Sequence, residues 1–316
     1  MSWLKTVTES DGNGGIGKMK LCQARGNTWY FADWQLIPFY RVGEHQCILL
    51  DTGMVSQREA LEAALQQAEL TPIGILGSHA HTDHSPNHHY FQQKYQIPVM
   101  LSVGEAGLCA TRLNLKAYFY MLSPRQAGIE GDVAQMELIA DEVITPDETE
   151  VSFCGVDFGI VHTPGHSPDH ISIRTPDDVL YLGDALLTDG ELKDAKLPYF
   201  FSHRDAIASM EKLRDEKAEL YLAAHRGTLT DLDPVIDENI ALIEDRDRQV
   251  LELIDSPMTM GEIEERACQH FHLLSSNISR AALYERNIRT YVEDLRDTGQ
   301  VEVTARRGIL YYERKT

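Results

Sequence analysis

Residues 78–84 read Ser-His-Ala-His-Thr-Asp-His and follow directly on the apolar run Pro-Ile-Gly-Ile-Leu-Gly at 72–77. In a regular helix or strand the three histidines and the aspartate would not share one face, but a loop at a strand end can aim all four side chains at one point. Neutral imidazole nitrogens and carboxylate oxygens are ligands that zinc and neighbouring transition metals accept. The stretch therefore predicts a metal site at the end of a buried strand, in preference to a solvated polar loop.

Three further strand-like runs end in a side chain that can bind a metal, in the order His166, Asp184 and His225. Pro164 and Gly165 predict a sharp turn that presents His166. Taken alone, an aspartate or a histidine at the end of an apolar run is an ordinary exit from a strand. Together, the four strand ends deliver five histidines and two aspartates, which strengthens the prediction of a metal site.

The order and spacing of these residues resemble those of a known family. The motif His79-x-His81-x-Asp83-His84, followed by His166, Asp184 and His225, resembles the metallo-β-lactamase superfamily, and most of all its glyoxalase-II-like branch. The resemblance covers roughly residues 20–230 and implies an α/β fold, the αββα sandwich of that family. The runs themselves alternate between strand and helix patterns up to about Leu222, which is typical of α/β layers.

The resemblance also implies a role for each ligand. A first metal would be held by His79, His81 and His166, and a second by Asp83, His84 and His225, with Asp184 bridging the two. His81 stands where the flavodiiron branch has a glutamate, which favours hydrolysis over redox chemistry. Two divalent ions are implied, with zinc as the first choice, although iron and manganese accept the same ligand types.

The chemistry implied by such a site is the activation of water. Two bound dications lower the pKa of a shared water from about 15.7 towards 7 and stabilise charge that develops on the substrate oxygen. Asp83 would keep one free carboxylate oxygen and is the candidate catalytic residue that orients the nucleophile. Asp51, which opens the strand-end sequence Asp-Thr-Gly, and His170 are expected to support the ligands through hydrogen bonds.

Two segments between the ligand loops are candidates for contact with the substrate. The first contains Lys193, Lys196, Tyr199 and Phe200. The resemblance makes these candidate substrate-binding residues, because the glyoxalase-II-like branch uses this stretch for its substrate. The second, residues 113–132, carries an aromatic group at 118–121 that would either line the site or pack in the core or at a dimer surface. We favour packing, because most aromatic clusters are buried.

The chain of 316 residues is long enough for one large domain and one small domain. Its composition changes after residues 231–234, and we place the boundary there. Residues 1–234 would form the metallo-β-lactamase-like catalytic domain, and residues 235–316 a winged-helix-like C-terminal domain.

The C-terminal segment has the outline of a winged helix. It predicts helices at 234–255, 259–272 and 279–298, followed by a β-hairpin that turns at 305–308. Thr259 and Glu262 form a capping-box pattern, which predicts the start of the second helix. Similar domains follow the catalytic domain in lactamase-like hydrolases.

The charge pattern does not favour nucleic acid as a partner. The formal net charge of −20 at pH 7 repels polyanions at long range. A winged helix that reads DNA has a basic third helix, but here residues 287–297 mix Arg289 and Arg296 with three acidic residues. Only the wing, with Arg306 and Arg307, is basic. We therefore expect a small-molecule substrate and a C-terminal domain that packs or dimerises, so that a homodimer is a further expectation.

The remaining sequence features predict a cytoplasmic protein with no membrane association. No N-terminal apolar run resembles a signal peptide, and no run approaches the roughly 18 apolar residues of a membrane span. The five scattered cysteines fit reduced thiols. Residues 12–17 match G-x-G-x-x-G, but no apolar strand precedes them and Met19 stands where a P-loop needs serine or threonine, so we interpret them as a turn.

The first functional hypothesis is a metal-dependent hydrolase of a small ester, thioester or lactone. The second is a phosphodiesterase or ribonuclease of the same fold. The third is a non-catalytic nucleic-acid-binding or regulatory module, and the complete set of seven ligands argues against it. A β-lactamase proper is disfavoured, because those enzymes work outside the cytoplasm.

Overall fold

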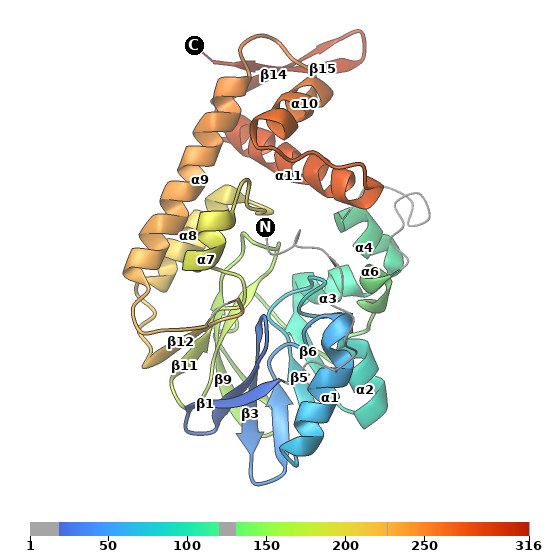
Figure 1. Ribbon diagram of the computed structural model, residues 1–316, viewed down its shortest axis with the longest axis vertical. Coiled ribbons are helices and arrows are strands. Elements are labelled where there is room, and N and C mark those ends of the chain that lie inside the picture. The colour runs from blue at the N-terminus through green and yellow to red at the C-terminus, as the bar shows by residue number, and fades with distance from the viewer. Residues whose placement is uncertain (1–18, 120–130, 226, 316) are drawn as a thin grey trace, which may run out of the picture.

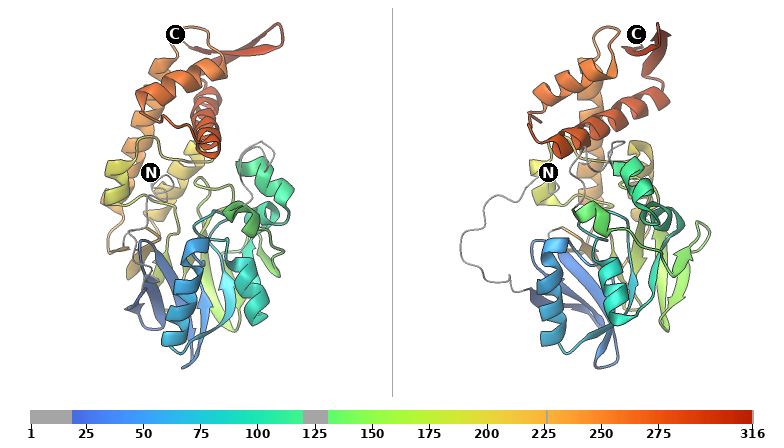
Figure 2. Two further views of the ribbon diagram at one scale, coloured as in Figure 1. Left: turned by 45° about the vertical axis from the view of Figure 1, so that its right-hand side comes forward. Right: turned by 90° about the vertical axis from the view of Figure 1, so that its right-hand side faces the viewer.

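The computed structural model describes residues 19–119, 131–225 and 227–315. The glycine-rich match at 12–17 and part of the aromatic group at 118–121 lie outside these ranges. Two sheets face each other in the lower half of Figure 1, helices flank them, and the C-terminal helices and hairpin form the upper part; Figure 2 shows the same arrangement from two further sides.

The first sheet carries the ligand loop 78–84 at the end of its fifth strand. Its order is β1 (Lys20–Arg25), β2 (Thr28–Ala32), β3 (Leu36–Val42), β4 (Gln46–Leu49), β5 (Thr71–Leu76), β6 (Val99–Ser102) and β7 (Glu142–Ile144). Strands β1 to β4 are antiparallel, and β4 to β7 are parallel. Gly26, in the turn between β1 and β2, and Gly43, in the turn between β3 and β4, both have positive φ, which glycine adopts without strain.

The second sheet carries the other three ligand loops. Its order is β13 (Gly227–Leu229), β12 (Leu220–Ala223), β11 (Val179–Tyr181), β10 (Ile171–Arg174), β9 (Val156–His162) and β8 (Glu150–Phe153). The pair β11 and β12 is parallel and the other pairs are antiparallel. The loops that follow β11 and β12 therefore leave from the same edge of the sheet.

Alternating side chains divide the core into layers. On β4, Cys47 and Leu49 face a cluster under the helices of the first sheet, while Ile48 on the opposite face belongs to the cluster between the two sheets. On the second sheet, Tyr181 faces the cluster between the sheets and Leu180 faces the helices behind. This alternation follows from the two-residue period of a strand, and it buries both faces of each sheet.

Helices cover the outer face of each sheet. The first sheet is covered by α1 (Arg58–Gln67), preceded by the 3-10 turn η2 (Val55–Gln57), and by α2 (His88–Tyr95), α3 (Val103–Cys109), α4 (Arg112–Phe119) and α6 (Asp132–Gln135). The second sheet is covered by α8 (His203–Leu213) and the first half of α9 (Asp233–Leu253), with α7 (Asp189–Asp194) packed beside α9. The expected α/β arrangement of helix, sheet, sheet and helix is confirmed.

The C-terminal part contains the predicted three helices and hairpin. They are α9, α10 (Met260–His270), α11 (Ile278–Asp297), β14 (Val301–Arg306) and β15 (Ile309–Arg314). Thr259 caps α10, and its capping box with Glu262 is formed as predicted. A β-bridge between Met258 and Tyr312 joins the hairpin to the segment just before α10.

Helix α9 joins the two parts without a break (Figure 1). Its residues Ile236 and Ile243 pack in the cluster behind the second sheet, whereas Val250 packs with α10 and α11. The expected boundary at 234/235 thus falls at the start of this helix, while the hydrophobic packing changes later along it, between Ile243 and Val250. None of the helices in the described ranges is long and apolar enough to cross a membrane.

Candidate metal centre

The four predicted ligand loops meet at one edge of the sandwich. The loop 78–84 follows β5, and the other three follow β9, β11 and β12. The N–H of Leu36, at the start of β3, donates to the carbonyl of Ala224 across 2.7 Å, and this bond joins the two sheets beside His225. Residues up to 146 positions apart in the sequence are therefore delivered to one buried site.

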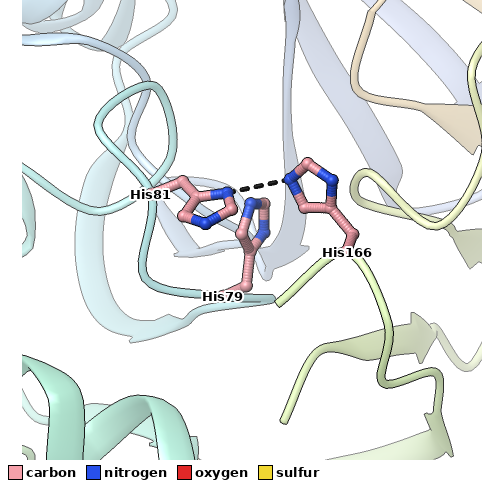
Figure 3. A group of neighbouring side chains, drawn as sticks. All are labelled: His79, His81 and His166. Carbon is pink, nitrogen blue, oxygen red and sulfur yellow. Dashed lines mark hydrogen bonds between the residues drawn. The ribbon is translucent and has the colours of Figure 1, made fainter. Parts of the chain in front are cut away.

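A first group consists of three buried histidines, His79, His81 and His166 (Figure 3). One ring nitrogen from each lies within 4.8 Å of the others. Nδ1 of His81 and Nε2 of His166 are 2.8 Å apart. Burial, together with the neighbouring histidines, holds the pKa of His79 well below its ordinary value, so its ring is neutral and has a lone pair for a metal.

A second group consists of Asp83, His84, Asp184 and His225, again within 4.8 Å of one another. Nε2 of His225 lies 3.3 Å from Oδ2 of Asp83. Burial opposes protonation of His225, but Asp184 and Asp83 raise its pKa to about 10. The two carboxylates thus favour positive charge in this group. A metal cation can supply that charge in place of a proton on His225.

Asp184 lies between the two groups. Its Oδ2 is 3.4 Å from Nε2 of His166 in the first group. Its Oδ1 is 3.3 Å from Nε2 of His84 and 3.5 Å from Nε2 of His225 in the second. One carboxylate oxygen therefore faces each group.

The site fits metal ions. Five atoms that face it are buried and have no hydrogen-bond partner within the described ranges: Nε2 of His79, Oδ1 of Asp83, Nε2 of His84, Oδ1 of Asp184 and Nε2 of His225. A buried polar atom without a partner costs roughly 1–3 kcal/mol, more when it is charged. Five such atoms in one place indicate that cations complete the site.

A family model for the metallo-beta-lactamase superfamily matches residues 36–225, which run from the start of β3 to just past β12 and include all seven predicted ligands. The chain belongs to this superfamily. The buried His/Asp groups around Asp184 lie within the matched residues.

Several named relatives in the superfamily match part of the chain. It is 29% identical over 158 residues to a probable metallo-hydrolase, YqgX, of Bacillus subtilis, covering 48% of this chain and 66% of that protein. It is 26% identical over 147 residues to hydroxyacylglutathione hydrolase of Glaesserella parasuis, covering 46% and 48%. It is 22% identical over 227 residues to atrochrysone carboxyl ACP thioesterase of Claviceps purpurea, covering 71% and 59%. The chain thus spans about half to two thirds of these relatives.

Solved structures of the superfamily share the fold over most of the chain. The metallo-beta-lactamase family protein TTHA1429 of Thermus thermophilus matches with a TM-score of 0.68 and 21% identity, covering 89% of this chain and 94% of that one. A beta-lactamase domain protein of Burkholderia ambifaria matches with a TM-score of 0.68 and 15% identity, covering 94% of each chain. A coverage of 94% extends past the start of α9, so the shared fold includes C-terminal helices.

Asp51, just after β4, contacts the second group through its side chain. Its Oδ2 accepts hydrogen bonds from Nδ1 of His84 at 2.8 Å, the hydroxyl of Tyr181 at 2.7 Å and Oγ of Ser78 at 2.5 Å. Burial would raise the pKa of Asp51, but the hydrogen bond and charge of His84 keep it lowered. The ring of His84 is thereby held with Nε2 towards Asp184.

His170, which the sequence predicts to lie outside the ligand set, is hydrogen-bonded to the backbone of Asp184. Its Nδ1 is 2.8 Å from the hydroxyl of Thr163, and its Nε2 accepts from the N–H of Asp184 at 3.1 Å. Burial, then the charge of His166, lowers the pKa of His170 to about 3, so the ring stays neutral and can accept. Gly183 has φ +54°, and a Cβ there would lie 2.5 Å from Nε2 of His170, so this position requires glycine.

Glu105, at the start of α3, is a supporting residue that the sequence analysis missed. Oε2 accepts from the N–H of Ala80 at 2.8 Å, between the first two ligands. Oε1 accepts from the hydroxyl of Ser167 at 2.6 Å and the N–H of Asp169 at 2.9 Å, in the loop of His166. The fully buried carboxylate therefore joins two ligand loops. A lone glutamate in a short helix carries no spacing signal that would have revealed this role.

The structure places the four candidate substrate-binding residues in different surroundings. Tyr199 lies beside the first group, with its ring centroid 5.9 Å from that of His81. Phe200 is buried in the cluster behind the second sheet. Lys193 is exposed on α7, and Nζ of Lys196 donates to the carbonyl of His272 at 3.0 Å. Of the four, Tyr199 is the one that the structure brings to the ligands.

Two other aromatic residues lie against the ligands. Trp34, 40% exposed, stacks on His225 with ring centroids 5.2 Å apart. Tyr118, from the aromatic group of α4, places its hydroxyl 2.9 Å from Nε2 of His81. The aromatic group was expected to be packing, but Tyr118 contacts a ligand directly. Trp34 had no sequence signal, since single aromatic residues are common at strand ends.

Proposed function

We propose that this protein is a dinuclear metallo-hydrolase of the glyoxalase-II-like branch, which cleaves a small ester, thioester or lactone. The observation that carries the proposal is the position of Asp184, with one oxygen towards His166 and the other towards His84. A single carboxylate placed in this way suits a bridge between two cations. The substrate is a small molecule, and nucleic acid is not the expected partner.

Each of the two groups would hold one metal ion. His79, His81 and His166 would bind the first ion, Asp83, His84 and His225 the second, and Asp184 both. When bound, two divalent ions lower the pKa of a water towards about 7 and polarise the carbonyl oxygen of the substrate. Zinc is the metal we propose, because imidazole and carboxylate ligands suit it and it supports no redox side reaction.

The chain's own groups complete the catalytic site. Asp83 faces His225 with Oδ2, while its buried Oδ1 has no partner within the described ranges. With one of its two oxygens on the second metal, Asp83 would keep the other to accept a hydrogen bond from the attacking water and to take its proton, which is why we propose Asp83 as the catalytic base. Trp34 and Tyr199 border the ligands and would enclose the acyl group.

Two observations support acyl over phosphoryl substrates. Relatives with 22–26% identity are named for a thioesterase and for hydroxyacylglutathione hydrolase. On α11, which would read nucleic acid in the winged helix that we propose for the C-terminal part, Arg289 and Arg296 pair with acidic neighbours, Arg296 at 2.6 Å from Glu293. These two arginines therefore present little free positive charge to phosphates.

The test is a set of initial rates on four substrates: a glutathione thioester, an acyl-homoserine lactone, an activated phosphodiester and a chromogenic β-lactam. Each is measured with zinc-loaded protein, with protein stripped by a chelator, and with Asp184→Asn. We expect metal-dependent turnover of the thioester or the lactone that the variant lacks. Turnover of the phosphodiester alone would replace the acyl proposal with a nuclease and make Arg306 and Arg307 the next targets.

A further inference from the structure

Helix α11 of the C-terminal part borders the metal centre, although none of its residues belongs to the predicted ligand set. Nη1 of Arg286 donates to the carbonyl of Tyr118 at 2.9 Å, at the end of α4. The next residue, Asn287, donates to the carbonyl of Leu197 at 2.9 Å, two residues before Tyr199. Figure 1 shows the N-terminal end of α11 next to α4. The helix therefore fixes two segments that each carry a tyrosine to the first metal group.

The guanidinium of Arg286 is enclosed by aromatic rings. Its central carbon lies 4.1 Å from the ring centroid of Tyr199, 4.8 Å from that of Tyr118 and 5.2 Å from that of Phe119. A cation in such a position is attracted by the negative face of the ring, most strongly where water is excluded. Arg286 thus contacts both tyrosine rings, while its hydrogen bond holds the backbone of Tyr118.

Tyr118 in turn determines how His81 faces the metal group. Its hydroxyl lies 2.9 Å from Nε2 of His81, and the two rings stack at 5.9 Å. The hydroxyl of Tyr199 donates to that of Tyr118 at 3.4 Å. A phenol oxygen that accepts from Nε2–H leaves Nδ1 of His81 with its lone pair towards His166.

We infer that Arg286 is a positioning residue for the metal centre: it holds Tyr118, and the Tyr118 hydroxyl holds His81 with Nδ1 towards the first metal. The C-terminal part is then a structural component of the active site and not a separate module. The inference uses the ligand assignment of the proposed function, but it concerns metal affinity and can be tested without turnover.

The first experiment measures zinc affinity by competition with a chelator, and the absorption spectrum of the cobalt-loaded protein. The variants are Tyr118→Phe, Arg286→Met and their combination. Loss of a partner that orients a ligand lowers metal affinity by about 10- to 100-fold. We expect a loss in this range and an altered cobalt spectrum for each single variant. Because Arg286 acts through Tyr118, the double variant should lose no more than the weaker-binding single variant.

The matched control is Arg289→Met, on the same helix but paired with Glu264 and Glu285 away from the ligands. It should keep wild-type zinc affinity, and thermal unfolding of all variants checks that the helix stays packed. Additive losses in the double variant, or unchanged zinc affinity in a folded Arg286→Met, would overturn the inference.

Kinetics separate positioning from direct recognition of the substrate. The Nε of Arg286 is buried and has no hydrogen-bond partner within the described ranges. The alternative role for Arg286 is therefore to donate a hydrogen bond from Nε to an anionic group of the substrate. If Arg286 positions Tyr118, Arg286→Met lowers kcat equally for a neutral ester and for its carboxylate analogue. A rise in KM confined to the carboxylate analogue, with zinc affinity unchanged, would instead make Arg286 a substrate-binding residue. If the wild type hydrolyses no ester, thioester or lactone, the proposed function fails, and the zinc measurements still decide the inference.

Discussion

Oδ2 of Asp51 and Nδ1 of His84 lie 2.8 Å apart, and both side chains are almost completely shielded from water. This hydrogen bond determines which nitrogen of His84 is available at the metal centre. Asp51 itself has φ +67°, a left-handed conformation that is uncommon for a residue other than glycine. Its side chain is held there by the N–H of Ser78, which donates to Oδ1 at 2.8 Å.

Replacing Asp51 with asparagine should weaken the second metal site. The amide can no longer stabilise the imidazole as a carboxylate does, so we expect zinc affinity to fall by about 10- to 100-fold and turnover with it. Chelator competition measures the affinity. Asp157→Asn, at an exposed position on β9, is the matched control and should bind zinc as the wild type does. Wild-type affinity in Asp51→Asn would show that Asp51 does not orient His84.

Replacing Asp184 with asparagine should remove turnover while the fold persists. The variant loses the charge that faces both groups, so we expect elemental analysis to find two metals per wild-type chain and at most one in the variant. Circular dichroism and the thermal midpoint check the fold. Retained activity with two bound metals would contradict the bridging role.

Removing the metals should destabilise the protein. A ligand present at 100 times its dissociation constant stabilises the folded state by about 2.7 kcal/mol. We therefore expect chelation to lower the thermal midpoint and added zinc to restore it, with the midpoint rising as free zinc increases. A midpoint that does not depend on metal would mean that the buried cluster is satisfied without cations.

Replacing Glu105 with alanine should cost both stability and metal affinity. The variant leaves the N–H groups of Ala80 and Asp169 without their acceptor, and each buried donor left unpaired costs roughly 1–3 kcal/mol. Urea unfolding of the metal-free protein measures the stability, and chelator competition measures the affinity. If stability falls but zinc affinity stays at the wild-type value, Glu105 supports the fold and does not position the ligand loops.

Glu264 on α10 should make stability depend on pH. Burial, then the charge of Glu285, raises its pKa to about 7, against 4.5 for an unperturbed glutamate. Because the unfolded chain loses this proton first, the residue destabilises the fold progressively as pH rises from about 4.5 to 7, and by a constant amount above. Glu264→Gln should therefore raise the thermal midpoint at pH 8 and leave it unchanged near pH 4. An equal shift at both pH values would contradict the assignment.

Much of the fold could be predicted because its signals are local. The capping pair Thr259 and Glu262 predicted where α10 begins, and the apolar run at 72–77 predicted the strand that the structure has as β5. The seven candidate ligands were identified because each follows an apolar run, and the structure brings all of them into the two adjacent groups. The sequence did not show that α9 packs against both the second sheet and the C-terminal helices. A helix has the same spacing of apolar residues whichever cluster it contacts.

The sequence by itself determined which side chains reach the end of the sandwich, because a strand ends where its apolar run ends and the next residues must turn. The tertiary structure alone decided what surrounds them. Glu105 reaches Ala80 across 25 positions and the loop of His166 across 62 to 64, and Arg286 reaches Tyr118 across 168. Such contacts leave no periodic trace in the sequence, because they depend on how separate layers pack and not on how one segment folds.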